Sequence, residues 1–288
     1  MSKLCILVLA FLFAQSAQAE PACAHCAAWN KTQQPFRIYG NTYYVGVHGL
    51  SSILITSDQG HVLIDGDLRE SPAKIAASIA KLGFRIEDVK LILNSHVHHD
   101  HAGGIAKLQH LSGATVAASA SSARVLMQGH SGPDDPLYGE LRSIPAVRDV
   151  KIVKDGETLH VGSLELTAHL TPGHTPGGTS WTWKSCENQR CLHMVYADSL
   201  MPIAASAFRF THNSNYPNVL EDFQKSFTTL NALPCDILLT PHPDLSEFLS
   251  ARLGGTEVRP MVDATACRRY AEAARERLSK RVARENSQ

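Results

Sequence analysis

The 288-residue sequence lacks an excess of charge of either sign, because 27 Lys and Arg residues balance 27 Asp and Glu residues. Without a basic excess, the chain has no electrostatic footprint of a general nucleic-acid-binding protein. It also lacks an apolar run of membrane-spanning length. The run at residues 4–13 has ten residues, about half of the ~20 that a spanning helix needs. We therefore expect no nucleic-acid partner and no membrane insertion.

After the first 19 residues the sequence has no internal repeat, no charge block and no Ser/Gly linker, so we expect a single domain at residues 20–288. Residues 1–19 have the pattern of a secretory signal peptide. Lys3 precedes the apolar run, and Ala17 and Ala19 form a small-x-small cleavage site. A lipoprotein anchored at Cys23 is the alternative, although the Glu-Pro-Ala sequence before it does not suit that signal. We expect cleavage after Ala19 and a soluble periplasmic protein.

Six cysteines remain once the signal is removed, and in an oxidising compartment disulfides are their expected state. We expect the pairs Cys186–Cys191, Cys235–Cys267 and Cys23–Cys26. The first pair flanks a polar stretch between two strand-like runs, and the second is the natural long-range pair. The third resembles a metal or redox motif, but it stands near a chain end without a second cysteine pair. A short-loop disulfide is therefore the favoured interpretation.

Strand-like and helix-like patterns interleave in both halves of the chain. Alternating or apolar runs predict strands at residues 42–47, 52–57, 60–64, 89–94, 114–118, 164–170, 178–183, 192–196 and 236–240. Apolar residues at helical spacing predict helices at 71–82, 101–111, 119–127, 219–230 and 261–283. This order predicts an α/β sandwich of sheets with helices outside.

Histidine is abundant, with 15 residues, and its neutral imidazole is a common metal ligand. The apolar strand at 89–94 leads directly into the sequence His96-Val97-His98-His99-Asp100-His101. In an extended segment His96 and His98 point to the same side, so both can reach one ion. Asp100 and His101, at the turn into the next helix, can reach a second ion, whereas His99 must point away.

Three further strands end in residues that bind metals or polar substrates. His174 follows the strand at 164–170, His242 follows the strand at 236–240, and Asp198 and Ser199 follow the strand at 192–196. Catalytic zinc usually has three protein ligands and an open position. Four strand ends that carry such residues predict a site for two metal ions at one edge of the fold.

The motif His96-x-His98-x-Asp100-His101, with His174 and the late His242, resembles the metallo-β-lactamase superfamily, and in detail the zinc β-lactamases of its third subclass. The resemblance implies a four-layer αβ/βα sandwich with the metal site at one edge of the two sheets. It implies two Zn²⁺ per chain, of which the first is bound by His96, His98 and His174. The second would be bound by Asp100, His101 and His242, since no cysteine stands near Ser199.

The resemblance also implies the reaction. Two zinc ions lower the pKa of a shared water towards about 7, and the resulting hydroxide would attack the lactam carbonyl of penicillins, cephalosporins and carbapenems. His98, His174 and Asp100 belong to the implied catalytic centre, with Asp100 both ligand and orienter of the nucleophile. Ser199 is the expected contact for the substrate carboxylate, but related enzymes have a serine or threonine where this chain has Met201.

Two aspartates are expected behind the ligands. Asp65 could hold the His96 loop as a hydrogen-bond acceptor, or it could be an ordinary turn residue. Asp198 could support the loop that presents Ser199. In a thioesterase resembling glyoxalase II, or in a lactonase, a carboxylate such as Asp198 would instead bridge the metals, and this reaction is the main alternative.

A non-catalytic periplasmic zinc-binding protein is a second alternative, although ligands dispersed over about 150 residues do not suit scavenging. We expect a monomer whose partners are small β-lactam molecules, with residues 127–138 as a loop over the cleft. Phe36 and Tyr43 are expected to pack in the core or a strand rather than to touch substrate.

Overall fold

The computed structural model describes residues 20–253 and 261–287, so the predicted signal peptide lies outside the described residues. The strands are β1 (Phe36–Tyr39), β2 (Thr42–Tyr44), β3 (Ile53–Ile55), β4 (His61–Ile64), β5 (Val89–Leu93), β6 (Thr115–Ser119), β7 (Val150–Val153), β8 (Thr158–Val161), β9 (Leu164–Leu170), β10 (Thr179–Glu187), β11 (Arg190–Tyr196) and β12 (Ile237–Leu239). The helices are α1 (Cys26–Trp29), α2 (Pro72–Lys81), α3 (His99–Ala102), α4 (Ile105–Ser112), α5 (Ala120–Gln128), α6 (Val219–Ala232), α7 (Glu247–Arg252) and α8 (Ala266–Asn286), with short 3-10 turns η1 (Ile86–Asp88) and η2 (Pro243–Leu245).

The strands form two sheets. The first has seven strands in chain order, β1 to β7, which pair antiparallel up to β4 and parallel from β4 onwards. The second has the order β12-β11-β10-β9-β8, antiparallel except for the parallel pair of β11 and β12. Parallel strands bring their carboxyl ends to one edge of a sheet. The residues that follow β5, β11 and β12 therefore gather at that edge.

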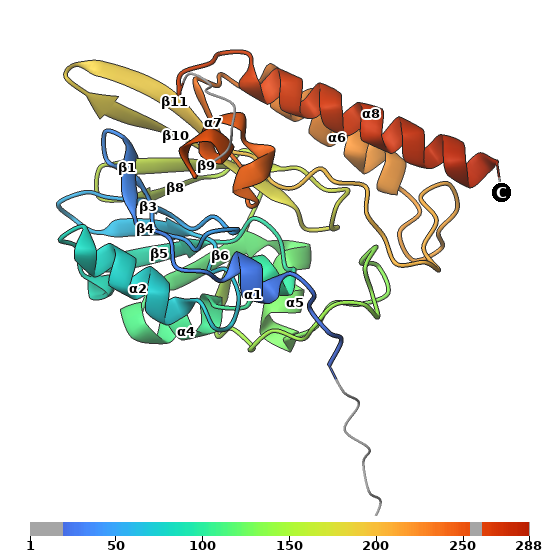
Figure 1. Ribbon diagram of the computed structural model, residues 1–288, viewed down its shortest axis with the longest axis horizontal. Helices are drawn as coiled ribbons and strands as arrows, with labels where there is room; N and C mark the ends of the chain where they lie inside the picture. The colour runs from blue at the N-terminus through green and yellow to red at the C-terminus, as the bar shows by residue number, and fades with distance from the viewer. Residues whose placement is uncertain (1–19, 254–260, 288) are drawn as a thin grey trace, which may run out of the picture.

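The two sheets face each other and helices cover both outer faces (Figure 1). A core that includes the fully buried Trp181 lies between the sheets. A second core packs α2, α4 and α5 on the seven-stranded sheet, and a third packs α6 and α8, which lie side by side, on the five-stranded sheet. The four-layer αβ/βα sandwich is thus confirmed.

All nine predicted strands are present, eight of them with shifted ends, but the single helix predicted at 101–111 is wrong. The chain forms α3 and α4 instead, with Gly103 and Gly104 between them. At Gly104 a Cβ atom would lie 2.1 Å from the carbonyl oxygen of Gly66. This close approach to the turn after β4 interrupts the helix. The last helix also begins later than predicted, at Ala266.

The prediction lacked β1, β7 and β8 and the short helices α1 and α7. Phe36 and Tyr43 pack as expected: Phe36 stacks on Tyr44 with ring centroids 5.2 Å apart, and Tyr43 meets the edge of Phe84 at the same distance. None of the helices in the described ranges is long and apolar enough to cross a lipid bilayer.

All three expected disulfides are present: Cys23–Cys26, Cys186–Cys191 and Cys235–Cys267. The second pairs directly opposite residues of the β10–β11 hairpin. The third joins the segment before β12 to the first turn of α8.

Candidate metal centre

The predicted ligands meet where the strands end. Two residues separate the end of β5 from His96, and His98 is the residue that precedes α3. Asp100 and His101 lie in α3 itself. The other two histidines follow strands of the second sheet: His174 lies in the loop between β9 and β10, and His242 follows β12. The site therefore spans both sheets at one edge, as expected.

His96, His98 and His174 form the first group. Their candidate ligand atoms lie within 4.8 Å of one another, and each residue is 4% exposed or less. Their rings approach with centroids 4.7–4.9 Å apart. Three imidazoles at this spacing match a zinc site that leaves a fourth position open.

Asp100, His101 and His242 form the second group, also within 4.8 Å of one another. The Asp100 Oδ2 atom is 3.4 Å from His101 Nε2 and 3.3 Å from His242 Nε2, and these two nitrogens are 3.2 Å apart. The His96 and His101 rings, with centroids 4.4 Å apart, connect the two groups. The donor set therefore suits two neighbouring ions.

Partners on the outer side of the rings determine which nitrogens face the centre. His96 Nδ1 lies 2.7 Å from Asp198 Oδ1, and His174 Nδ1 donates to the carbonyl oxygen of Met201 at 2.8 Å. His98 Nε2 lies 3.3 Å from Asp135 Oδ1. Such contacts set the tautomer and the orientation of ligand imidazoles. The remaining nitrogen of His96, Nε2, is buried and has no hydrogen-bond partner among the described residues, which fits a metal ligand.

Burial and charge favour the ligand forms of most of these groups. Burial lowers the pKa of His96, His101 and His174 well below the usual value, so their imidazoles are neutral, as zinc binding requires. Burial opposes ionisation of Asp100, but His101 and His242 outweigh it and hold the pKa of Asp100 well below its usual range.

His98 and His242 differ from the other histidines. Burial acts to lower the pKa of each, but Asp135 beside His98 and Asp100 beside His242 outweigh it, and both pKa values are raised. A raised pKa favours the protonated form of these two imidazoles, and a divalent ion that binds them displaces those protons.

Asp65 lies beneath the ligand loop. Its side chain accepts hydrogen bonds from Ser95 N at 2.8 Å, Ser95 Oγ at 2.6 Å and Tyr196 OH at 2.8 Å. Burial raises the pKa of Asp65 to about 7, and its backbone has a φ of 60°. Because Ser95 immediately precedes His96, Asp65 connects the ends of β4, β5 and β11 below the first group.

Asp198 belongs to neither ligand group in the described part of the chain. Its carboxylate contacts His96, and its backbone oxygen accepts from Tyr270 OH of α8 at 3.0 Å. Burial raises the pKa of Asp198 well above its usual value. Ser199, the next residue, is 2% exposed. Asp198 thus connects the first ligand group to the helix layer behind it.

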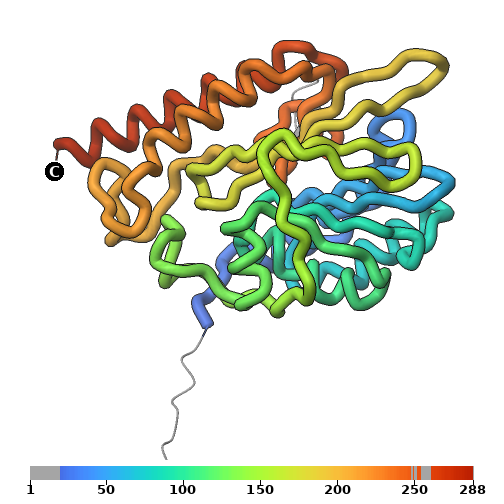
Figure 2. The backbone as a smooth tube through the Cα atoms, turned by 180° about the vertical axis from the view of Figure 1, so that it is seen from behind, coloured from blue at the N-terminus to red at the C-terminus, as the bar shows by residue number. Residues whose placement is uncertain are grey.

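Asp135 also contacts the candidate site, but the sequence analysis did not identify it. It lies within residues 127–138, which were expected to form a loop over the cleft. The connection from α5 to β7 places it against His98. Ala205 N donates to Pro136 O at 2.9 Å, and the two segments lie next to each other when seen from behind (Figure 2). A carboxylate in an irregular loop has no periodic signal, so no pattern could identify Asp135.

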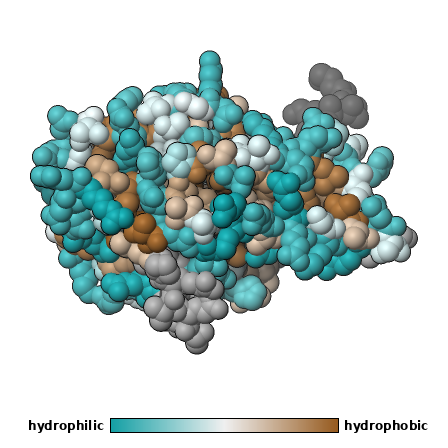
Figure 3. Space-filling view, turned by 90° about the horizontal axis from the view of Figure 1, so that it is seen from above, coloured by the Kyte–Doolittle hydropathy of each residue, from teal (hydrophilic) through white to brown (hydrophobic). Residues whose placement is uncertain are grey.

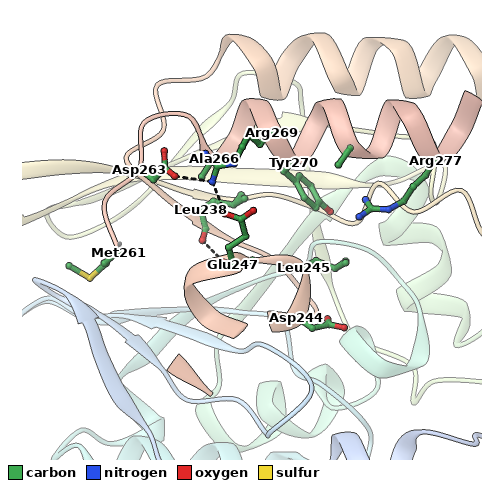
Figure 4. Close-up of a pocket in the computed structure, with 12 residues that line it drawn as sticks. Leu238, Asp244, Leu245, Glu247, Met261, Asp263, Ala266, Arg269, Tyr270 and Arg277 are labelled. Carbon is green, nitrogen blue, oxygen red and sulfur yellow. Dashed lines mark hydrogen bonds and ion pairs between the residues drawn. The ribbon is translucent and has the colours of Figure 1, made fainter. Parts of the chain in front are cut away.

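A separate pocket of ≈200 Å³ lies between α7 and α8, and none of the six ligand candidates lines it. Arg269 extends to both Asp263 and Glu247 there (Figure 4), at 2.8 and 2.7 Å. These ion pairs join the start of α8 to α7. Arg269 immediately precedes Tyr270, the α8 residue whose hydroxyl contacts Asp198.

Comparison with known proteins agrees with this geometry. A family model described as "Metallo-beta-lactamase superfamily" matches residues 45–187. Among solved structures, the Rm3 metallo-beta-lactamase is 55% identical with a TM-score of 0.87, over 92% of this chain and 100% of that one. MEM-A1, a subclass B3 metallo-beta-lactamase from a soil metagenome library, is 51% identical with a TM-score of 0.85, over 90% of this chain and 99% of that one.

A curated relative, a hydroxyacylglutathione hydrolase of Pseudomonas paraeruginosa, is 35% identical over 122 residues, which are 42% of this chain. That match covers 36% of the relative's own length. Similarity to the lactamase structures therefore extends over the whole fold, whereas similarity to the thioesterase is confined to a part of it.

Proposed function

This chain belongs to the metallo-β-lactamase superfamily, and we propose that it is a two-zinc hydrolase that opens the ring of penicillins, cephalosporins and carbapenems. The observation that carries the proposal is the division of six buried or half-buried ligands into two adjacent groups of three. The near full-length similarity to metallo-β-lactamase structures at 51–55% identity supports the substrate class.

In this proposal each group of side chains has a defined task. His96, His98 and His174 hold the first zinc ion, and Asp100, His101 and His242 hold the second. When bound, the two ions supply Lewis acidity that acidifies a water molecule and polarises the lactam carbonyl. Asp198, Asp135 and the carbonyl of Met201 hold the three imidazoles of the first group in place from behind.

Asp100 also orients the attacking water, because its carboxylate is the one acidic group among the six ligands. Ser199 would donate to the carboxylate of the substrate. Met201 cannot help with its side chain, and its backbone oxygen is already engaged by His174. Ser199 would therefore bind that carboxylate without a second hydroxyl two residues later.

A thioesterase is the second candidate function, favoured by the similarity to hydroxyacylglutathione hydrolases. A thioesterase of that kind would use Asp198 as a bridge between the ions. In this structure the Asp198 carboxylate lies 2.7 Å from His96 Nδ1, on the outer side of the ring, and His101 and His242 complete the second group without it. The contact of Asp198 therefore supports lactam hydrolysis.

The setting of the enzyme is part of the proposal. We infer removal of residues 1–19, export of residues 20–288 to the periplasm and action as a monomer. The face above α6 and α8 is mainly hydrophilic (Figure 3), and a monomer rarely exposes large apolar patches. Export would place the enzyme where it meets β-lactams before they reach their targets.

A substrate panel tests the proposal. The zinc-loaded protein should hydrolyse nitrocefin and a carbapenem, lose both activities to a chelator and regain them with zinc. Clavulanate, which acylates serine enzymes, should not inhibit it. Turnover of S-lactoylglutathione without opening of a carbapenem would favour the thioesterase, and zinc binding without turnover of either would favour a storage protein.

A further inference from the structure

A third cluster of ligand-type side chains lies outside the two groups described above. It consists of Cys23, Cys26 and His99, whose candidate ligand atoms lie within 4.8 Å of one another. Cys26 Sγ is 3.8 Å from His99 Nε2, and all three residues are half-buried. The Nδ1 atom of His99 is buried and has no hydrogen-bond partner in the described ranges. His99 is the one histidine of its motif that neither group uses.

The spacing suits a tetrahedral ion. With Zn–S of about 2.3 Å and Zn–N of about 2.0–2.1 Å, a tetrahedral zinc separates a sulfur from a nitrogen by about 3.6 Å. The observed 3.8 Å between Cys26 Sγ and His99 Nε2 is close to that value. The two sulfurs are bonded to each other as a disulfide, and once that bond is broken they would need to lie about 3.8 Å apart. The Cys-x-x-Cys spacing of zinc sites allows this separation.

The segment that carries the cysteines is held in place by other contacts. Gly49 N and His48 N donate to the backbone oxygens of Trp29 and Lys31 at 3.0 and 2.9 Å. The Trp29 ring also packs against the His242 ring, with centroids 5.1 Å apart. Figure 1 shows α1, in dark blue, against the body of the molecule. Breaking the disulfide would therefore leave Cys26, in α1, beside His99, and Cys23 only three residues away in the chain.

The short loop closed by the Cys23–Cys26 disulfide and the partial exposure of its cysteines both favour its reduction. The disulfide closes a loop with a sequence separation of 3, and short loops contribute least to stability through chain entropy. Thiol–disulfide exchange requires access of the attacking thiol, and Cys23 and Cys26 are both partly exposed. By contrast Cys235 and Cys267 are 6% and 2% exposed.

We propose that Cys23, Cys26 and His99 form a redox-gated site for a thiophilic divalent ion such as Zn²⁺. An external dithiol reduces the Cys23–Cys26 bond: the dithiol gives up two hydrogen atoms and becomes a disulfide, and the protein gains two thiols. The ion then displaces both thiol protons, is bound by two thiolates and the neutral imidazole, and takes a water in the fourth position. Oxidation by a disulfide restores the original bond and releases the ion.

The site has a direct structural consequence. His99 stands between His98 and Asp100 in the chain, one from each catalytic ligand group. An ion on His99 would cross-link the start of α1 to the start of α3, where these ligands lie. The redox state of the surroundings would then be coupled to the rigidity of that part of the site.

Metal content in the two redox states tests the proposal. The mature protein is reduced with a dithiol under anaerobic conditions, freed of the dithiol by gel filtration, and dialysed against zinc beside an oxidised sample. The reduced protein should retain one more zinc per chain than the oxidised protein. With Co²⁺, it should show thiolate-to-metal charge-transfer absorption that the oxidised protein lacks.

The chain provides a matched control. Cys186 and Cys191 form another exposed short-loop disulfide, and they belong to no metal-type cluster among the described residues. The double variant Cys186→Ser/Cys191→Ser should keep the extra zinc and the absorption, whereas Cys23→Ser/Cys26→Ser should lose both. An unchanged zinc content on reduction, or an extra ion that persists in Cys23→Ser/Cys26→Ser, would refute the site.

A single variant tests the imidazole. His99→Asn keeps the disulfide and a polar side chain, and its thermal unfolding would verify that it folds. The zinc affinity of the third site should fall at least tenfold in the reduced variant, and the cobalt spectrum should change. If the reduced variant binds the extra ion as tightly as the parent, His99 is not a ligand and the proposed ligand set is wrong.

Discussion

At the scale of single residues, each imidazole of the first group is held on its outer side by a different kind of partner. His96 has the buried carboxylate of Asp198, His98 has Asp135, and His174 has a backbone oxygen. Loss of such a partner typically costs 10–100-fold in metal affinity. We therefore expect the strength of metal binding to depend also on residues that lie behind the candidate ligands.

Asp135→Asn tests this dependence. The substitution keeps the side-chain volume but removes the charge beside His98, so we expect the zinc dissociation constant to rise ~10–100-fold, as measured by competition with a chromophoric chelator. Asp134→Asn is the matched control, because Asp134 pairs with Arg124 and its side chain is 31% exposed. Equal affinities of the two variants would show that Asp135 does not support His98.

Ser199→Ala tests the proposed contact with the substrate carboxylate. Loss of one hydrogen bond to a charged group, worth about 1.5 kcal/mol or more, should raise KM for a penicillin about tenfold. The kcat and the zinc content should change little, because the hydroxyl is not one of the six ligands. Steady-state kinetics check this, and a fall in kcat at constant KM would contradict the binding role.

The sequence predicts the candidate metal ligands better than it predicts the carboxylates that lie behind them. The six ligands follow strands, where alternation and chain order determine which side chains converge. For Asp65, two interpretations were left open, and only the contacts with Ser95 and Tyr196 show what its carboxylate does. Asp135 depends on the path of an irregular loop, which a pattern of side chains does not encode.

At the scale of elements, the loop between β9 and β10 positions His174 through a glycine. Gly173 has a φ of +134°, and a Cβ atom there would lie 2.7 Å from the ring of Phe223 in α6. An L side chain is therefore excluded both by its backbone conformation and by the packing of α6. The tight approach fixes where His174 enters the site.

Gly173→Ala should lower the free energy of unfolding by about 1–3 kcal/mol and weaken zinc binding as His174 shifts. Gly83→Ala, at a φ of +88° with nothing within 4 Å of the added Cβ, serves as the control for backbone strain alone. Urea unfolding and zinc competition measure both effects. If both variants lose stability equally and bind zinc normally, the contact with Phe223 does not position His174.

The long-range disulfide should stabilise the fold more than the hairpin disulfide. Loop closure over 32 residues for Cys235–Cys267 predicts about 3.7 kcal/mol, against about 2 kcal/mol over 5 residues for Cys186–Cys191. Urea unfolding of the two double Cys→Ala variants measures the difference. A smaller loss for Cys235→Ala/Cys267→Ala would mean that α8 is held mainly by its packing on α6.

The sequence predicts strands best where one face of the strand is buried, and less well for short strands at the edge of a sheet. β9 was predicted with the observed ends because buried and exposed positions alternate along it. β7 and β8 are edge strands of four residues with only one and two buried positions, so their apolar signal in the sequence is weak. The break between α3 and α4 depends on contact with the turn after β4, a tertiary effect that helical periodicity cannot reveal.

At the scale of the whole molecule, the candidate site draws on both sheets and on helix α8. The first sheet supplies His96, His98, Asp100 and His101, the second supplies His174 and His242, and α8 holds Asp198 through Tyr270. A centre assembled from segments so far apart in the chain forms only when the sandwich is complete. Zinc binding should therefore be linked to folding of the entire domain.

The two-ion centre is tested most directly by measuring the rate of carbapenem hydrolysis at increasing molar equivalents of zinc. Zinc is added stepwise to the chelator-treated, oxidised protein, and loss of the lactam absorbance is followed at each step. The account predicts no hydrolysis without metal and a rate that rises until two equivalents are bound per chain. Full activity at one equivalent would contradict the two-ion centre, and no hydrolysis at any occupancy would contradict the proposed function itself.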